Sequence, residues 1–381
     1  MRKLGFLLLL AAIGPTAPGQ TRVTVGQMEQ LLASFQHQPD AKVARQLSGF
    51  ELTERVTSDT LSRWETEFSG KRTQETLTAL ADASAFLDLP AADLPAAPPP
   101  ELAAQEQIFS RIAGYVSKTL SKLPNFSALR TTTYFETSTP RQLLQQRQLQ
   151  VYQLNNSNPS FRSLGPLNSA ESKSIQLYSA GTWGVVVTYR DGLEVEDALS
   201  RNGKHAAPPA VGLTTKGEFG PILYVVLGDA IHGKVTWGHW ERGTNELLAV
   251  FHYEVHRELS HFAVASGIFS PADYPAYHGE IAVDPASGTI FRITIEADHL
   301  PSDSMSESSI LVEYGPVPIG GNIYICPVRA VATLKQPSTA ADGSSLPASA
   351  PLQTFVNDVS FTKYHVFRSD ARVLPGFSTS P

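Results

Sequence analysis

Histidines are concentrated in one stretch of the sequence, whose members are His232, His239, His252, His256, His261 and His278. Within this stretch, His252, Glu254 and His256 alternate with apolar residues. If the segment is a β-strand, its period of two places two imidazoles and one carboxylate on the same face. Such a set of nitrogen and oxygen ligands suits Zn²⁺. The three residues are therefore candidates for a metal site and, with it, for a metal-dependent hydrolase.

The same alternation has a simpler interpretation. Phe251, Tyr253 and Val255 would take the apolar face of the strand, and the histidines and the glutamate would face solvent. The spacing also differs from the HExxH motif, which places two zinc ligands on one face of a helix. A solvated strand face and a metal site both remain open, and no cofactor is assigned.

Motifs for other chemistry do not occur in the sequence. It contains no G-x-S-x-G elbow, no P-loop and no G-x-G-x-x-G fingerprint. No spacing identifies a pair of carboxylates as general acid and base. The single cysteine, Cys326, lies in an apolar segment, and we expect it to be a small buried hydrophobic residue. These observations favour a non-enzymatic protein.

The composition is that of a folded protein with a mildly acidic charge. Of the 381 residues, 42% are hydrophobic and 17% are charged, and the formal net charge is −6. Binding to a phosphate backbone or to an anionic membrane surface depends on clustered Lys and Arg, and this chain has no such cluster. We therefore expect no nucleic acid partner.

The N-terminus has the pattern of a secretory signal peptide. Basic residues at positions 2 and 3 precede an apolar run from Leu4 to Ile13, and the small residues Ala17 and Gly19 provide a cleavage site. The apolar run is too short to span a bilayer permanently. We expect residues 1–19 to be removed on export, which would leave a periplasmic or extracellular protein without a transmembrane anchor.

Residues 20–89 have the apolar spacing of amphipathic helices. Apolar side chains recur every three or four positions in successive segments, which begin near Thr24, Asp40, Ser58 and Arg72. Thr24 is an expected N-cap of the first helix. Helices this short are not stable alone, so they must pack against one another or against the rest of the protein.

The second of these helices is expected to take Asp40 as its N-cap and to continue to Val56. A linker rich in Pro and Ala follows at 90–100, where the chain should be extended and semi-rigid. A long helix is predicted at 101–124, and Pro124 ends it.

From residue 125 the apolar period changes from near four to two, which is typical of strands. About eleven strands with mostly hairpin connections are expected up to residue 370, and they include segments 149–154, 175–179, 184–190 and 261–265. So many antiparallel strands curl rather than stay flat. The predicted fold class is therefore α+β, in which the helical region precedes a large curved antiparallel sheet, a half-barrel, at 125–370. A tail follows at 371–381.

One hairpin is especially clear, at 277–296. Its turn is Asp284–Gly288, in which Pro285 presets φ and Gly288 supplies a positive φ. We expect Phe291, Ile293 and Ile295 to share one face of the second strand, with Arg292 on the opposite face.

An apolar segment at 219–231 interrupts the strand pattern. Pro221 near its start and the spacing of its aliphatic residues favour a helix over a strand. We expect this helix to lie against the sheet.

The strand region resembles the periplasmic lipoprotein-carrier superfamily, the LolA/LolB/RseB-like proteins. The resemblance rests on the long meander, the inserted apolar helix and the hairpin residues Tyr277, Gly279, Ile281, Val283, Asp284, Pro285, Gly288, Ile290 and Arg292. It extends to 312–316 and 319–324, and it covers about residues 125–370. The whole chain is also similar to a group of exported acidobacterial proteins, through segments 40–44, 51–55 and 81–87.

The resemblance implies a concave apolar surface, partly closed by helices, that holds an acyl chain of a lipid or lipoprotein. The ligand-binding residues would then be those of the inserted helix, namely Phe219, Leu223, Val226, Leu227 and Ile231. The alternative is that this helix completes a permanent core, because apolar pockets and apolar cores have the same composition. The small lipoprotein carriers have no counterpart of the N-terminal helices of this chain. A second alternative is therefore a structural or protein-interaction module, in which these helices dock a protein partner.

Overall fold

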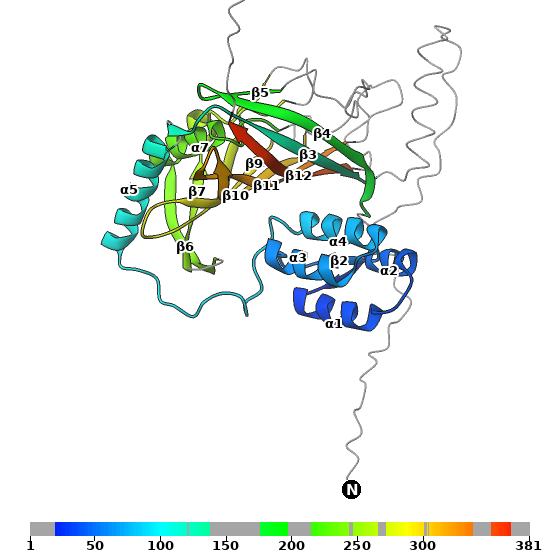
Figure 1. The fold of residues 1–381 in the computed structure, drawn as a ribbon. Coiled ribbons are helices and arrows are strands. Elements are labelled where there is room, and N and C mark those ends of the chain that lie inside the picture. The colour runs from blue at the N-terminus through cyan, green and yellow to red at the C-terminus, as the bar shows by residue number, and fades with distance from the viewer. Residues whose placement is uncertain are drawn as a thin grey trace, which may run out of the picture.

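The computed structural model shows two units joined by an extended segment (Figure 1). The residues that it describes are 20–119, 122–137, 176–196, 215–243, 247–265, 272–300, 303, 305–337 and 352–366. The predicted signal peptide, the predicted strand at 149–154 and the predicted tail at 371–381 lie outside the described residues.

The N-terminal unit packs short helices around a small two-stranded sheet. Its elements are β1 Thr21–Val23, α1 Val25–Phe35, α2 Asp40–Leu47, β2 Phe50–Leu52, α3 Ser58–Glu67 and α4 Lys71–Ala83. Their apolar stripes meet in one cluster, in which Met28, Leu32, Leu47 and Leu77 are almost fully buried. The helices predicted from apolar spacing are confirmed as elements of one packed unit.

The helix caps are only partly as predicted. Thr24 caps α1 in a capping box with Gln27, as the sequence predicts. Asp40, however, is the first residue of α2, and its carboxylate accepts hydrogen bonds from the backbone N–H groups of Arg72 and Thr73. Asp40 therefore caps the start of α4 instead of its own helix, which ties two helices together.

The predicted continuation of the second helix to Val56 is wrong. Helix α2 ends at Leu47, and Phe50–Leu52 pairs in parallel with Thr21–Val23 as a strand. Leu52 points into the core of the unit from this strand. Pairing with a distant segment thus overrides the helical spacing of the local sequence.

Within the described ranges, the large sheet contains ten antiparallel strands, in the order β5-β4-β3-β12-β11-β10-β9-β8-β7-β6. They are β3 Phe126–Glu136, β4 Tyr178–Arg190, β5 Leu193–Glu196, β6 Lys234–Arg242, β7 Leu247–Val255, β8 Ala276–Val283, β9 Ile290–Asp298, β10 Glu307–Ile319, β11 Asn322–Pro337 and β12 Leu352–Val366. The α+β class with a large antiparallel sheet is confirmed. The strands expected separately at 175–179 and 184–190 are one strand, β4, while 261–265 forms only an isolated bridge through Val264.

The predicted hairpin is formed by β8 and β9, and its turn contacts a helix. Gly288 has a φ of 76°, and a Cβ atom there would lie 2.4 Å from the backbone carbonyl carbon of Arg111. The Arg111 guanidinium in turn donates to the carbonyl of Pro285 at 2.8 Å. The glycine is therefore required both by the turn and by the close approach of the neighbouring helix α5, Leu102–Thr119.

A bulge changes one predicted face of this hairpin. The pairing shifts between Ala282, opposite Arg292, and Val283, opposite Ile290, so Phe291 has no direct partner. Phe291 consequently packs with Ala282 on the face that also carries Arg292, and Ile290 takes its place in the core. The prediction that Phe291 lies with Ile293 is wrong, because a bulge breaks the period of two.

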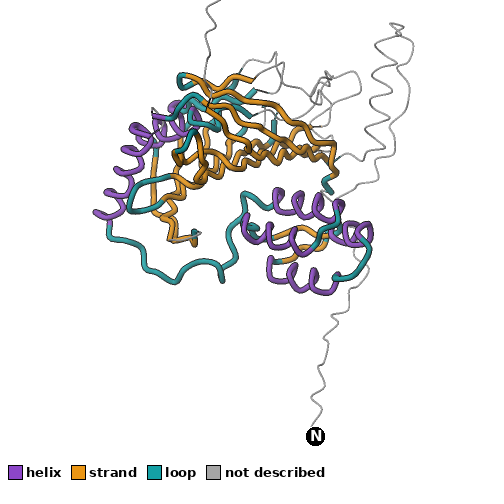
Figure 2. Tube along the Cα trace, viewed as in Figure 1, coloured by secondary structure: helices purple, strands orange, loops and turns teal. Residues whose placement is uncertain are grey.

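Helices lie on both sides of the sheet (Figure 2). On one side, α5 and α7, Pro221–His232, pack against the largest apolar cluster of the protein. We call this side of the sheet the apolar face. On the opposite side, which we call the polar face, α4 contacts β12 and β4. No helix among the described residues is both long and apolar enough to cross a membrane.

Candidate functional site

The inserted helix is present at the predicted place, and four of the five predicted ligand-binding residues are buried. Phe219 lies in the turn before α7, and Leu223, Val226 and Leu227 lie on the helix face that packs on the sheet. Ile231 is different, because 57% of its surface is exposed. The structure thus brings four residues together on the apolar face and leaves Ile231 in solvent.

Phe219 is the centre of an aromatic group beneath the start of α7. The nearest ring centroids lie 5.1 to 6.4 Å from its own and belong to Phe361, Phe126, Tyr364 and Tyr189. Edge-on and tilted contacts of this kind stabilise a core beyond the area that they bury. In this structure Phe219, one of the residues predicted to touch a ligand, therefore contacts aromatic side chains of the sheet.

The C-terminal end of α7 is held by one acidic side chain. The Asp229 carboxylate accepts hydrogen bonds from the Tyr277 hydroxyl and from the backbone N–H of His261, each at 2.8 Å. Its other oxygen lies 2.6 Å from Nδ1 of the exposed His261, and this contact raises the pKa of the imidazole. Burial and the bond to Asp229 raise the pKa of Tyr277. Asp229 was missed from the sequence, although it is the single acidic residue in an otherwise apolar helix.

A pair of acidic side chains, Glu194 and Glu218, lies at the other end of α7. Glu194 accepts a hydrogen bond from the backbone N–H of Gly217 at 3.0 Å, and it lies 3.8 Å from Arg130. Burial, and then the nearby Glu218, raise the pKa of Glu194 to about 7. The Tyr314 hydroxyl donates to the Glu218 carbonyl. Polar contacts thus hold both ends of α7, and its middle is apolar.

The polar face carries a buried group of alternating charges. Arg55, from the N-terminal unit, contacts Glu241 at 3.0 Å and Glu280 at 3.6 Å. Arg292 binds the same two carboxylates, with a distance of 3.0 Å to Glu280. Burial alone would raise the pKa of Glu241, but Arg292, His239 and Arg55 together hold it below its ordinary value.

A second set of ion pairs joins the two units beside the first. Arg329, on β11, contacts Asp358 at 3.0 Å and pairs with Asp82 on α4. Ser58, at the start of α3, donates to Glu313 at 2.6 Å. The N-terminal unit is therefore attached to the sheet through directional polar contacts as well as through a small apolar cluster.

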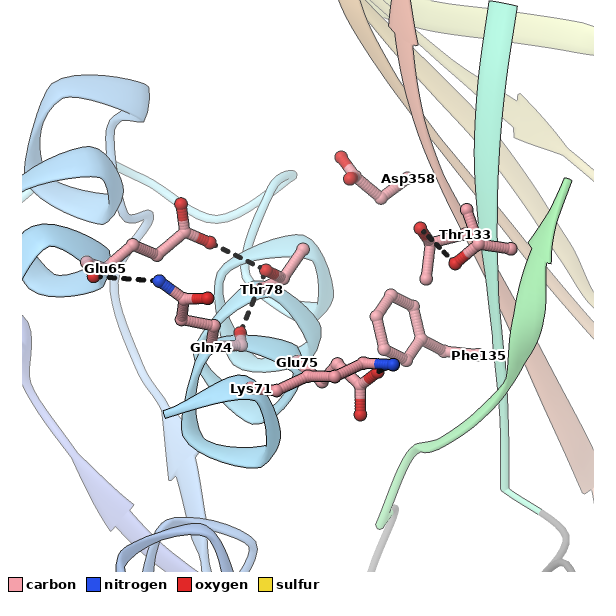
Figure 3. Close-up of a pocket in the computed structure, with 9 residues that line it drawn as sticks. Glu65, Lys71, Gln74, Glu75, Thr78, Thr133, Phe135 and Asp358 are labelled. Carbon is pink, nitrogen blue, oxygen red and sulfur yellow. Dashed lines mark hydrogen bonds and ion pairs between the residues drawn. The ribbon is translucent and has the colours of Figure 1, made fainter. Parts of the chain in front are cut away.

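A pocket of about 260 Å³ lies where α4 approaches the polar face. It is bordered by charged and polar side chains of both units, with Phe135 as its apolar wall (Figure 3). Lys71 and Glu75 approach from the helix, while Thr133 and Asp358 lie on the strands. This lining differs from the apolar surface that the lipoprotein-carrier resemblance implies.

The predicted trio of metal ligands is not brought together. Strand β7 ends at Val255, so His256 lies outside it and does not continue the alternation. Glu254 forms an ion pair with Lys234 at 3.1 Å instead. His252 and Glu254 do lie on the polar face and are exposed, as the solvated-face interpretation predicts.

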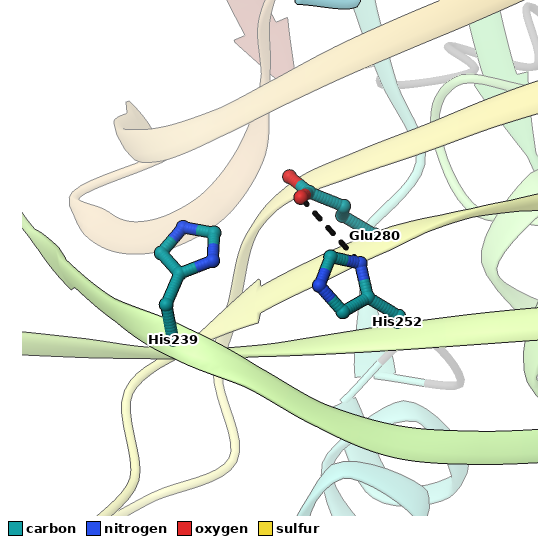
Figure 4. A group of neighbouring side chains, drawn as sticks. All are labelled: His239, His252 and Glu280. Atoms are coloured by element: carbon teal, nitrogen blue, oxygen red, sulfur yellow. Dashed lines mark ion pairs between the residues drawn. The ribbon is translucent and has the colours of Figure 1, made fainter. Parts of the chain in front are cut away.

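His252 belongs to a different group, formed with His239 and Glu280 (Figure 4). One ligand atom from each of these residues lies within 4.8 Å of the others. They come from the neighbouring strands β6, β7 and β8. Spacing within one strand could not reveal this group, because it depends on the register between strands.

A second group with metal-ligand chemistry contains Asp273, His299 and Asp303. Arg257 contacts Asp273 at 3.1 Å and Asp303 at 3.5 Å. Arg257 therefore pairs with both carboxylates, and the group offers one imidazole where the group of His239 and His252 offers two, so it has the weaker preference for a transition metal.

Comparisons with protein-family models, with curated proteins and with solved structures return no match for this chain. The functional argument therefore rests on the chain's own residues and geometry.

Proposed function

We propose that this chain is an exported, non-enzymatic protein that binds an acyl chain of a lipid or lipoprotein on the apolar face of its sheet. In this proposal the sheet is a half-barrel of the lipoprotein-carrier type, and α7 is a movable cover over the binding surface. The ligand would contact Phe219, Leu223, Val226 and Leu227 when the cover opens.

The observation that carries the proposal is the way in which α7 is attached. Its side chains facing the sheet are apolar, and its polar contacts are at its two ends, through Glu218 and Asp229. Apolar contacts are non-directional, so an acyl chain can replace those that the helix loses on opening. Each buried CH₂ group of such a ligand contributes about 0.8 kcal/mol.

We expect α7 to open from its C-terminal end. At the C-terminal end, Asp229 bonds Tyr277 and the loop residue His261, so loss of these bonds would free the last turn. A hydrogen bond to a charged group contributes about 1.5–3 kcal/mol. Weakening this end by about 1.4 kcal/mol would increase the open population tenfold.

Native mass spectrometry of the purified full chain, prepared without detergent, tests the proposal directly. We expect co-purified lipid and saturable uptake of a fluorescent fatty acid. The variant Tyr277→Phe, which cannot donate to Asp229, should take up the fatty acid about tenfold faster.

Tyr253→Phe is the matched control for this variant. Tyr253 is also buried, its ring centroid lies 5.8 Å from that of Tyr277, and its hydroxyl donates to the Thr294 carbonyl at 2.6 Å. This bond lies within the sheet, so its loss should leave the uptake rate unchanged. Protein that carries no lipid, and no uptake by either the natural chain or Tyr277→Phe, would rule the proposal out.

A second candidate function is a protein-interaction module, and the attachment of the N-terminal unit favours it. This unit meets the sheet through buried ion pairs of Arg55 and Arg329, and polar contacts of this kind are typical of interfaces that open and close. The helices would then dock a protein partner when they leave the sheet. Arg55→Met should increase co-purification of such a partner, and an unchanged set of co-purified proteins would argue against this function.

A further inference from the structure

We propose that His239, His252 and Glu280 form a binding site for one divalent transition-metal ion on the polar face, with Zn²⁺ as the best match. This site is separate from the proposed acyl-binding surface, which lies on the opposite side of the sheet. Two nitrogen donors and one oxygen donor suit Zn²⁺ and related ions better than Ca²⁺ or Mg²⁺, which prefer oxygen ligands.

The backbone of β6 is shaped to bring the two histidines together. The pairing with β7 shifts between Trp237 and His239, so Gly238 is an extra residue in the strand. A Cβ atom at Gly238 would lie 2.7 Å from Nε2 of His252. The glycine thus leaves room for the His252 ring, and the bulge turns His239 towards it (Figure 4).

The arginines of the charged group orient the carboxylate ligand. Glu280 uses Oε2 for Arg292 at 3.0 Å and for Arg55 at 3.6 Å. Its Oε1 lies 3.6 Å from Nδ1 of His252 and is therefore directed to the histidine side. In metal sites, residues that do not bind the metal themselves commonly orient a ligand through contacts of this kind.

A second carboxylate, that of Glu241, lies beside the ring nitrogen Nε2 of His239. Glu241 Oε2 lies 3.8 Å from His239 Nε2, and this nitrogen is buried without a hydrogen-bond partner among the described residues. Metal-bound histidines commonly direct their other ring nitrogen to a carboxylate. Since Arg55 and Arg292 offset the charges of Glu241 and Glu280, the imidazoles supply most of the preference for a transition metal.

The exposures of the ligands leave one side of the site open. The His252 side chain is 48% exposed, whereas those of His239 and Glu280 are 27% and 20% exposed. Ligands of Zn²⁺ lie about 2.0–2.2 Å from the ion and hence about 3.4 Å from each other. Metal binding therefore requires the ligand atoms, now within 4.8 Å of one another, to move closer, and we expect the half-exposed His252 side chain to make this movement and leave a fourth position for water.

Metal titration of the full chain, purified without a histidine tag and stripped with a chelator, tests the site. We expect one Zn²⁺ per chain by elemental analysis and saturable binding by calorimetry, with no comparable response to Mg²⁺ or Ca²⁺. His252→Gln should weaken Zn²⁺ binding by more than about 100-fold, since even outer-shell changes cost 10–100-fold. Gly238→Ala, whose methyl group meets the His252 ring, should weaken it by about tenfold.

His278→Gln is the matched control. His278 lies on the neighbouring strand β8, its side chain is 47% exposed, and it pairs with Asp298 instead of with the proposed ligands. Unchanged Zn²⁺ affinity in this variant, together with the loss in His252→Gln, supports the site. The proposal is overturned if the natural chain retains no stoichiometric Zn²⁺, if His252→Gln binds as well as the natural chain, or if both variants lose binding equally.

Discussion

The two faces of the large sheet are both covered by helices, but the covers are attached by different forces. On the apolar face, α5 and α7 bury aliphatic and aromatic side chains, and the polar contacts of α7 are confined to its ends. On the polar face, the N-terminal unit contributes Arg55 and Asp82 to groups of alternating charge.

The two kinds of contact differ in how much movement they allow to the helices that cover the sheet. Apolar packing depends on area, so it tolerates a shift of the helix or its replacement by another apolar surface. Buried ion pairs depend on distance and orientation, and a carboxylate or guanidinium left alone is costly. We infer that the ion pairs define where the N-terminal unit docks on the sheet, whereas the apolar contacts keep α7 on the sheet but allow it to shift.

The largest effect is expected on the apolar face. Phe219→Ala removes a ring that is 1% exposed and surrounded by aromatic side chains. It should lower the free energy of unfolding by about 3–5 kcal/mol, measured by chemical denaturation. Tyr224→Ala, on the outer side of α7 where the side chain is 46% exposed, serves as the control and should cost less than about 1 kcal/mol. Equal costs for the two variants would contradict the burial of Phe219 beneath the start of α7.

A smaller loss is expected when one charge is removed from the polar face. Glu241→Gln leaves Arg55 and Arg292 with a single shared carboxylate, Glu280, and should cost about 3 kcal/mol at pH 7. Because the pKa of Glu241 is lowered in the folded state, its contribution to stability is complete above the unfolded pKa of about 4.3 and is lost as the pH falls below that value. The difference between the natural chain and the variant should therefore shrink in acid.

Glu254→Gln is the control for this charge removal. Glu254 lies on the same face but is paired with Lys234 in solvent, so its neutralisation should change the free energy of unfolding by less than about 0.5–1 kcal/mol. If Glu254→Gln destabilised the chain as strongly as Glu241→Gln, burial of the charged group would not be the cause.

Beside α7, the same type of substitution should increase the free energy of unfolding instead of lowering it. The pKa of Glu194 is raised to about 7, so its contribution to stability is largest below the unfolded pKa of about 4.3 and is lost as the pH rises through the folded pKa. Glu194→Gln mimics the protonated form. It should increase the free energy of unfolding by about 1–2 kcal/mol at pH 8 and by almost nothing at pH 4, below the unfolded pKa. Destabilisation at pH 8 would show that the charged form of Glu194 is needed at this end of the helix.

Local patterns in the sequence predict the elements of both faces. The hairpin of β8 and β9 and the cap at Thr24 occur as predicted, and the helix predicted at 219–231 is observed as Pro221–His232, because each depends on neighbouring residues. Cys326 is buried and burial raises its pKa to about 12, which agrees with the expected hydrophobic role. The four buried residues of the candidate ligand surface were also accessible to sequence reasoning, since Leu223, Val226 and Leu227 form one face of an apolar helix and Phe219 directly precedes it.

The features that the sequence did not predict depend on contacts between segments that are distant in the chain. The bulges beside Gly238 and Phe291, the capping of α4 by Asp40 and the grouping of His239 with His252 and Glu280 all join segments that are distant in sequence. Each of the two bulges interrupts the alternation of side chains along its strand, and no local pattern in the sequence indicates where the strand pairing shifts. The sequence by itself therefore determined most of the strand and helix segments and which side chains are apolar, but not the strand Phe50–Leu52. Only the tertiary structure decided which polar groups meet, because that depends on register and on the docking of one unit on the other.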